Sequence, residues 1–462
     1  MNAPKTTSRS KVQLRDMTAG VVWQQLVLFA VPLILGDLLQ QLYSTVDSII
    51  IGQFMGKAAL AAVTGTETAI NILIGIYTGL SAGATIVLSH LFGAKEYDDL
   101  HDAVQTTMTL TLISGVFFSV LGVCIVPLLL KMLAVPDDVY RNAQIYLTIY
   151  FGGMMGLVMY NMCSSILRAV GNTKLPLLAL TVTSVSNICL DLLFVVVFHW
   201  GIVGAAGATV LSQLAAGLFL LCRLCAAEGP VRVELLHLTM KKRWLLRILK
   251  IGIPFSIQRS LVAVSNTLVI SRINYFGSGA MAAWGVYRKI DTLMMNVAQN
   301  LSVAVSTFVG QNYGAKKKER IRSGIKAGYV LVLCFSAVFI TTVIFSRRGL
   351  VSLFNREEDV ITFGCHIILF LMPFQFISSV NQIQAGTLRG YGDSQGPMLI
   401  TLFSHIAVRQ TFLFFAWRVS PKLETALMCY PIGWACCAFL TLLYSCFKTK
   451  KLLHAFDAPD SF

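Results

Sequence analysis

Two similar stretches decide the fold of this chain: VPLILGDLLQQLYSTVDSIIIGQFMGKAALAA at residues 31–62 and IPFSIQRSLVAVSNTLVISRINYFGSGAMAAW at residues 253–284. Each has a proline at its second position, Pro32 in the first stretch and Pro254 in the second. These matches indicate an internal repeat. The same offset brings together Phe54 with Phe276, Ala58 with Ala280, and Ala61 with Ala283.

Two later pairs of segments extend the repeat along the chain. LFGAK at residues 91–95 faces NYGAK at 312–316, and LRAVGN at 167–172 faces LRGYGD at 388–393. In both pairs the offset has changed by one residue. Because three matches in the same order are improbable by chance, the chain is predicted to consist of two related halves.

Composition places both halves in a membrane. Of the 462 residues, 56% are hydrophobic and only 13% are charged, whereas a soluble domain carries about 25% charged residues. A span needs about 20 mostly apolar residues, and inside lipid the backbone must satisfy its own hydrogen bonds, so the apolar runs are predicted to be helices. The candidate spans are centred near Leu35, Leu73, Phe117, Gly153, Thr183, Leu214, Val262, Met295, Leu333, Leu371, Phe403 and Ala438.

Twelve spans and a duplication predict an all-α integral membrane protein with twelve transmembrane helices in two six-helix bundles. Because six is even, both halves start from the same side, and we expect the bundles to be related by an axis along the membrane normal. The expected divisions are a tail at 1–20, a bundle at 21–228, a basic linker at 229–243, a bundle at 244–447 and a tail at 448–462.

The basic residues predict the orientation of the spans. If the N-terminus is cytoplasmic, the segments on that side hold 24 of the 37 Lys and Arg residues, and the opposite loops hold nine. This bias follows the positive-inside rule, so both termini are expected in the cytoplasm. Topology and lipid headgroups account for the net charge of +15, with no need for a nucleic-acid partner.

Polar residues inside spans are costly and usually face a cavity, which makes each of them a functional candidate. Asp47 lies in the first span, and Asn187 and Asp191, four residues apart, share one face of the fifth. Thr209 opens the sixth span. Their oxygens suit Na⁺, and carboxylates in a dry cavity can also carry a proton. If the coupling ion is Na⁺, Asp47, Asp191 and Asn187 are its expected ligands. The structural alternative is that these side chains only hydrogen-bond within the bundle.

A wider polar stripe in the first span suggests a substrate cavity. Its members are Asp37, Gln40 and Gln41, and a helix face of this kind is unfavourable in lipid. Earlier in the same span, Pro32 removes a helix hydrogen bond and could form a hinge or a static kink.

The second half offers different candidates. At the offset of the repeat Asp47 meets Val269, so the cation site is expected in the first half only. Arg259, Asn266 and Asp291 are further candidates for the substrate cavity, although Asp291 could simply pair with Arg288, three residues before it. A basic cavity would suit an anionic or zwitterionic substrate. The alternative for the arginines is that they snorkel to the membrane surface, which we expect of Arg409 more than of Arg259.

Several of these segments resemble one known family. LYSTVDSIIIG at residues 42–52, the two Gly-Ala-Lys turns, RAVGNTKLP at 168–176, SNICLDLLF at 186–194 and GIVGAAGATVLSQ at 201–213 are similar to the multidrug and toxic compound extrusion (MATE) family, most of all to its DinF-like bacterial branch. The resemblance implies a V-shaped pair of six-helix bundles that exports organic cations or other amphiphiles in exchange for Na⁺ or H⁺. It also implies that Asp47, Asp191, Asn187 and Thr209 form the cation site of the first half.

The sequence therefore predicts a secondary active antiporter of the bacterial inner membrane, monomeric, without a cofactor or enzymatic activity, which acts on small molecules. Two other functions stay open. One is a flippase for lipid-linked precursors, from the same superfamily. The other is a membrane-embedded prenyltransferase, since Asn187 and Asp191 have part of the spacing that such enzymes use to bind Mg²⁺-diphosphate.

The orientation can be tested by cysteine labelling in intact cells, in a background without the native cysteines. Cysteines at Lys242 and Lys317 should be shielded from a membrane-impermeant thiol reagent, whereas a cysteine at Asp138 should be labelled, because the basic bias places only Asp138 outside. Labelling of the Lys242 position from outside would overturn the orientation.

Overall fold

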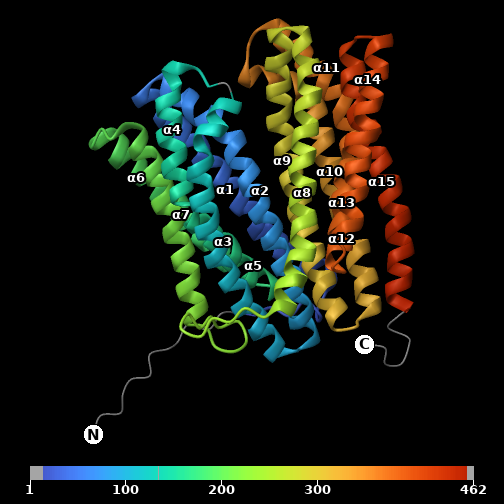
Figure 1. Ribbon diagram of the computed structural model, residues 1–462. Coiled ribbons are helices and arrows are strands. Elements are labelled where there is room, and N and C mark those ends of the chain that lie inside the picture. The colour runs from blue at the N-terminus through green and yellow to red at the C-terminus, as the bar shows by residue number, and fades with distance from the viewer. Residues whose placement is uncertain (1–13, 134, 455–462) are drawn as a thin grey trace. The chain divides into compact units, whose positions relative to one another are not determined.

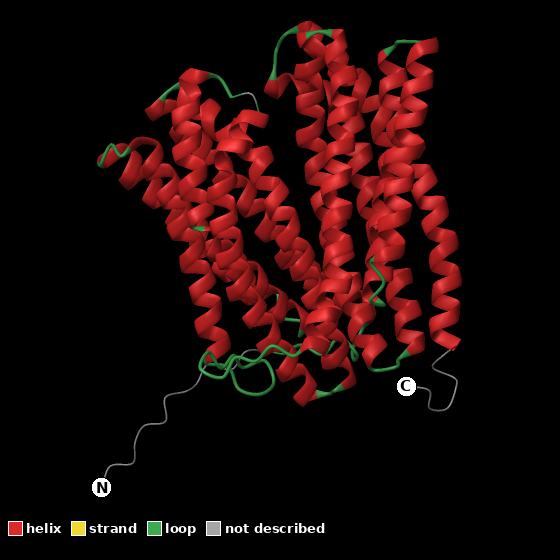
Figure 2. Ribbon diagram, viewed as in Figure 1, coloured by secondary structure: helices red, strands yellow, loops and turns green. Residues whose placement is uncertain are grey.

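The computed structural model describes residues 14–133 and 135–454, and every regular element within them is a helix (Figure 2). Figure 1 labels the helices in chain order. Those of the first half are α1 (Val22–Met55), α2 (Lys57–Ala94), α3 (Tyr97–Met132), α4 (Asp137–Gly152), α5 (Met154–Ala169), α6 (Lys174–Asp191) with the π-helical segment η1 (Leu192–Val197), and α7 (Gly201–Cys225).

The helices of the second half follow a similar order. They are α8 (Lys242–Ile273) with the 3-10 segment η2 (Asn274–Phe276), α9 (Ser278–Gly314), α10 (Lys318–Phe354), α11 (Glu358–Leu371) with the 3-10 segment η3 (Met372–Phe374), α12 (Gln375–Gly390), α13 (Gln395–Leu402) with the π-helical segment η4 (Phe403–Val408), α14 (Arg409–Val419) and α15 (Leu423–His454).

The helices form six membrane spans in each half, as the sequence predicts. Ten helical segments are long and apolar enough to cross a membrane, and α4 with α5, bent by 44° at their junction, gives an eleventh. The twelfth span is α9, which has 37 residues. It carries Arg288, Lys289 and Asp291 in its first half.

Packing divides the described residues into two compact units. Unit 1 comprises residues 14–16 and Val31–Gly252, and unit 2 comprises Met17–Ala30 and residues 253–454. The change of unit falls inside α1 and inside α8, directly beside Pro32 and Pro254. The basic linker 229–243 belongs to unit 1.

The start of α1 and the residues before it are held in unit 2 by hydrogen bonds. The amide of Met17 donates to Gln311 Oε1 at 2.8 Å, and the guanidinium of Arg320 donates to the carbonyl oxygens of Met17, Ala19 and Gly20. Met17 is fully buried. Residues 17–20 are therefore an integral part of unit 2.

The backbone confirms the repeat and corrects its alignment. Gly56, just before α2, has φ 81°, and Gly277, just before α9, has φ 91°. Glycine favours this left-handed region because it has no Cβ. Pairing Gly56 with Gly277 places the one-residue change of offset before α2, so the alignment of Ala58 with Ala280, and of Ala61 with Ala283, is wrong by one residue.

Side-chain hydrogen bonds repeat as well. In unit 1, Arg168 donates to Ser81 Oγ at 3.0 Å, and Ser81 donates to the carbonyl of Asn161 at 3.1 Å. In unit 2, Arg389 donates to Ser302 Oγ at 2.9 Å, and Ser302 donates to the carbonyl of Gln382. These links join α5 to α2 in one unit and α12 to α9 in the other.

The turn that follows each of these arginines has the same type of side-chain hydrogen bond in both halves. Asn172 Oδ1 accepts from the amide of Leu175 at 3.1 Å, and Asp393 Oδ1 accepts from the amide of Gly396 at 3.0 Å. Burial acts to raise the pKa of Asp393, but hydrogen bonds from Tyr444, Gly396 and Lys448 outweigh it, so the pKa is lowered. Asp393 therefore stays ionised and accepts a hydrogen bond from the first turn of α13.

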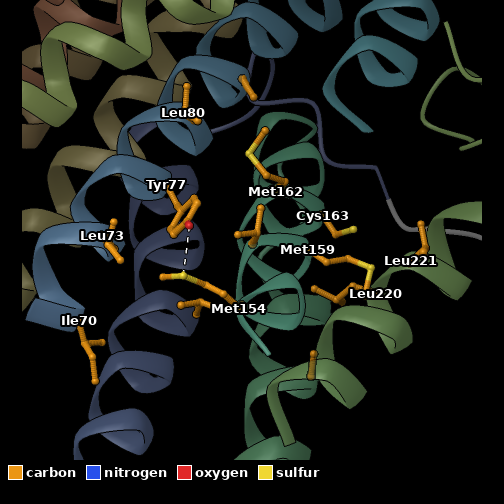
Figure 3. Close-up of a cluster of buried hydrophobic side chains, with 14 of the residues drawn as sticks. Ile70, Leu73, Tyr77, Leu80, Met154, Met159, Met162, Cys163, Leu220 and Leu221 are labelled. Atoms are coloured by element: carbon orange, nitrogen blue, oxygen red, sulfur yellow. Dashed lines mark hydrogen bonds between the residues drawn. The ribbon is translucent and has the colours of Figure 1, made fainter. Parts of the chain in front are cut away.

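Small residues let the helices of unit 1 approach closely. Figure 3 shows part of its core, where Tyr77 donates a hydrogen bond to Met154 Sδ at 3.3 Å. Two residues further along α5, a Cβ at Gly156 would lie 2.5 Å from the backbone nitrogen of Leu214 in α7. Glycine is therefore required at this crossing of α5 and α7.

Substitution of this glycine tests the packing of unit 1. Gly156→Ala should lower the unfolding free energy by about 1–3 kcal/mol, because the added methyl group meets backbone atoms that cannot move aside. Gly207→Ala in α7 is the matched control, since a Cβ there meets no atom within 4 Å. Thermal unfolding of the purified variants in detergent measures the difference. Equal unfolding temperatures for both variants would contradict the close crossing.

Candidate functional site

The structure brings Asp47 of α1 and Asp191 of α6 together within unit 1. The two carboxyl groups are close enough to interact electrostatically. Asp191 is completely buried, and Asp47 is half-buried. Asp191 is also the last residue of α6 before the π-helical segment η1. Such π-helical insertions are rare and occur often at functional sites.

Asn187 lies one turn before Asp191, and both residues have polar atoms without a partner. Asn187 is 1% exposed. Within the described part of the chain, neither oxygen of Asp191 and neither polar atom of the Asn187 amide has a hydrogen-bond partner. Because buried polar groups are nearly always satisfied, these atoms need an explanation such as a bound ion or proton.

Thr209 lies in the neighbouring helix α7, and its side chain is buried. Its hydroxyl donates to the carbonyl of Ala205 at 3.2 Å, in the same helix. This bond uses the only donor of the hydroxyl and leaves lone pairs that can face a cation.

Three tyrosines beside the aspartates were not among the residues predicted from the sequence. Tyr43 of α1 and Tyr146 of α4 both interact electrostatically with Asp47 and Asp191. Tyr150 stacks on Tyr146 with ring centroids 6.2 Å apart. The sequence held a signal for them, because Tyr43 precedes Asp47 by one helical turn and Tyr146 and Tyr150 share a helix face.

The other polar residues of α1 are placed apart from the aspartate pair. Asp37 interacts electrostatically with Arg168 and Tyr160 of α5. Gln40 and Gln41 are exposed. The structure thus assigns Asp37 to a second charged cluster in unit 1.

Asp291 of unit 2 is buried in an ion pair. Its Oδ2 accepts from Arg288 Nη1 at 2.8 Å, and its Oδ1 accepts from Gln375, which also donates to Tyr287 at 3.0 Å. Asp291 is 5% exposed. The pairing with Arg288 that the sequence suggests is present. Within the described residues, no group of three or more His, Cys, Asp or Glu side chains could hold a metal ion.

The expectation that Arg409 snorkels to the membrane surface is wrong. Arg409 is 1% exposed, donates to Asn266 Oδ1 at 2.8 Å and to Ser265, and lies over the ring of Tyr430 at 5.2 Å. It begins α14 directly after η4 and is therefore in the middle of a span, too far from a helix end to snorkel. Asn266, a candidate for the substrate cavity, is instead a partner of this buried guanidinium.

The structural role of Arg409 can be tested by truncation. Arg409→Ala should lower the unfolding temperature markedly, because hydrogen bonds from a charged group contribute about 1.5–3 kcal/mol each and the substitution removes those to Ser265 and Asn266. Arg259→Ala, at an exposed arginine of unit 2, should change the unfolding temperature much less. Equal effects of the two substitutions would refute the difference in burial.

Comparison with known proteins agrees with this architecture. The MatE family model matches residues 32–193 and 254–412, one segment in each half. The chain is 30% identical to the probable multidrug resistance protein YoeA of Bacillus subtilis over 96% of this chain and 98% of that protein, and 29% identical to YpnP of the same organism over 95% and 98%.

Solved structures of transporters share the fold. One is of a MOP superfamily transporter from Pyrococcus furiosus (TM-score 0.88, 21% identity, 97% of this chain and 99% of that chain). Another is of an outward-facing multidrug resistance MATE family transporter (TM-score 0.88, 20% identity, 96% and 99%). The prediction of twelve transmembrane helices in two six-helix bundles is confirmed. The chain belongs to the MatE family of multi-pass membrane transporters.

Proposed function

We propose that this protein is a secondary active antiporter that exports organic cations and other amphiphiles in exchange for Na⁺ or H⁺. The observation that carries the proposal is the buried pair of Asp47 and Asp191 beside the unsatisfied amide of Asn187. The family and the printed names of its multidrug resistance relatives support the class of activity.

The aspartate pair is suited to bind one monovalent cation at a time. Two neighbouring ionised carboxylates repel each other, and burial strengthens the repulsion. This repulsion is removed when one proton is shared between the two carboxylates, or when one Na⁺ is held by their oxygens and by Asn187 Oδ1. Thr209 could contribute a further oxygen. Release of the cation restores the repulsion, so occupancy changes the relative stability of conformations that hold the carboxylates together or apart.

Pro32 is suited to convert this change into movement. Asp47 lies on the same helix as Pro32, and α1 changes from unit 2 to unit 1 directly beside the proline. A proline within a helix leaves the carbonyl four residues earlier without its backbone donor, which lowers the cost of bending there. We therefore assign Pro32 the role of hinge, with the cation site on one side of it.

The substrate is proposed to contact polar residues that face a cavity in unit 1, with Asp37, Gln40 and Gln41 as candidates. Asp291 is proposed to stabilise unit 2, because it is already paired with Arg288. Both termini are proposed to lie in the cytoplasm of a bacterial cell, and the bias of the basic residues supports this orientation. The protein is proposed to act as a monomer, without a cofactor and without catalysis.

The assignment of the cation site predicts the effect of charge removal. Asp47→Asn and Asp191→Asn should each abolish gradient-driven efflux while leaving a folded, membrane-inserted protein, because each keeps the side-chain volume and removes one charge. Efflux of a cationic dye from proteoliposomes, driven by an imposed Na⁺ or pH gradient, measures the coupling and identifies the ion.

Asp291→Asn is the control variant, because it removes a buried carboxylate in unit 2, outside the proposed cation site. It should reduce stability or affinity without changing the number of ions that move per substrate, which the reversal potential in liposomes measures. If either variant at Asp47 or Asp191 still couples efflux to the gradient at the wild-type rate, that residue is not the ion carrier.

A further inference from the structure

The two units hold the same arginine in the same way but surround it with opposite charges. Arg168 and Arg389 are repeat partners, and each donates to a serine of the neighbouring helix, Ser81 or Ser302. The two units differ in which residue of the proline-bearing helix interacts electrostatically with this arginine. It is Asp37 in unit 1 and Arg259 in unit 2, and the offset that pairs Pro32 with Pro254 also pairs these two residues.

In unit 1 the arrangement is electrically balanced. The guanidinium of Arg168 is attracted by Asp37 and by the phenol of Tyr160. Asp37 is half-buried. The charges of this cluster therefore compensate one another within the unit.

In unit 2 two guanidinium groups take the same place. Those of Arg389 and Arg259 lie over the ring of Phe255, at 4.6 Å and 6.0 Å from its centroid, and they repel each other. Arg389 is 7% exposed, while Arg259 is exposed. Within the described residues, Arg389 forms no ion pair with a carboxylate. Burial of a guanidinium beside a second one is unfavourable unless an anion compensates it.

The chemistry of this pair defines the group that would compensate it. A planar guanidinium forms two parallel hydrogen bonds with a carboxylate, sulfonate or phosphate. Arg259 is the accessible donor, with Arg389 behind it. The ring of Phe255 offers an apolar surface beside both cations. The surroundings thus combine two adjacent guanidinium groups with a place for an aromatic or aliphatic group.

We propose that Arg259 and Arg389 form an anion-binding subsite in unit 2, which takes the acidic group of an amphiphilic substrate whose apolar part packs on Phe255. The inference rests on the proposed transport function and extends its substrates from cationic compounds to amphiphilic anions and zwitterions. The cation-coupling site in unit 1 is separate from it.

The test compares two probes that differ only in charge, pyrenebutyrate and its methyl ester. Their binding to the purified protein is measured by fluorescence anisotropy in nanodiscs of phosphatidylcholine, without an ion gradient. Arg259→Ala should weaken the binding of pyrenebutyrate at least about tenfold and leave that of the ester unchanged, because only the acid forms charge-assisted hydrogen bonds. Arg259→Lys should retain part of the affinity, and Arg259→Asp should lose it entirely.

Two further variants separate the subsite from general effects. Arg272→Ala removes another arginine of α8, which lies over Trp417, and should leave the binding of both probes unchanged. Arg389→Lys keeps the buried charge where Arg389→Ala could fail to fold, and it should weaken the binding of pyrenebutyrate but not that of the ester.

Three results would overturn the proposal. The first is an unchanged affinity of Arg259→Ala for pyrenebutyrate, and the second is an equal loss of affinity for the acid and for the ester. The third is that phosphatidylglycerol displaces pyrenebutyrate while the wild-type protein does not transport pyrenebutyrate. The last would identify the ligand as a lipid headgroup. Failure of the antiport itself is recognised separately, because a cationic dye would then not move with the gradient in the wild-type protein, whereas the binding measurement needs no gradient.

Discussion

The requirement that every backbone hydrogen bond within a lipid bilayer be made inside the chain governs this structure. It explains why all twelve spans are helices, and it makes each departure from a regular helix informative. The π-helical segments η1 and η4 are two such departures. One follows Asp191 and the other precedes Arg409, the most buried charged side chains of the two units. Both π-helical segments are thus found beside a buried charge.

The two units show how one scaffold can serve opposite electrostatic tasks. Duplication kept the turns, the serine-bound arginines and the proline-bearing helices. The side chains that determine charge diverged. Unit 1 has the paired carboxylates of Asp47 and Asp191, while unit 2 has Arg259, Arg389 and the buried Arg409. Because the conserved contacts are between helices and the changed residues lie on helix faces, charge could change without loss of the fold.

The fold could be predicted from the sequence because membrane spans and repeats are both long-range patterns that single substitutions do not erase. The pairing of Asp47 with Asp191 was also within reach, since few carboxylates lie inside spans. The surroundings of individual side chains could not be predicted in this way. The burial of Arg409 depends on Ser265 and Asn266 of α8 and on Tyr430 of α15, and no local pattern connects these positions. Tyr43 and Tyr146 escaped notice because aromatic residues in apolar helices more often serve packing alone.

The register of the repeat shows a different limit. The alignment of Ala58 with Ala280 was one residue out because alanines in a membrane helix carry little positional information, whereas Gly56 and Gly277 have a backbone conformation that fixes the start of the next helix. Turn geometry decided the alignment where side-chain identity could not.

The docking of residues 17–30 in unit 2 has a consequence for synthesis of the protein. This segment emerges first from the ribosome, but its partners Gln311 and Arg320 emerge only after the whole first unit has been made. Contacts between residues so far apart in sequence form late, because a long loop must close first. The beginning of the chain must therefore wait in a non-native state during translation, and neither half, expressed alone, contains all the residues of its own compact unit.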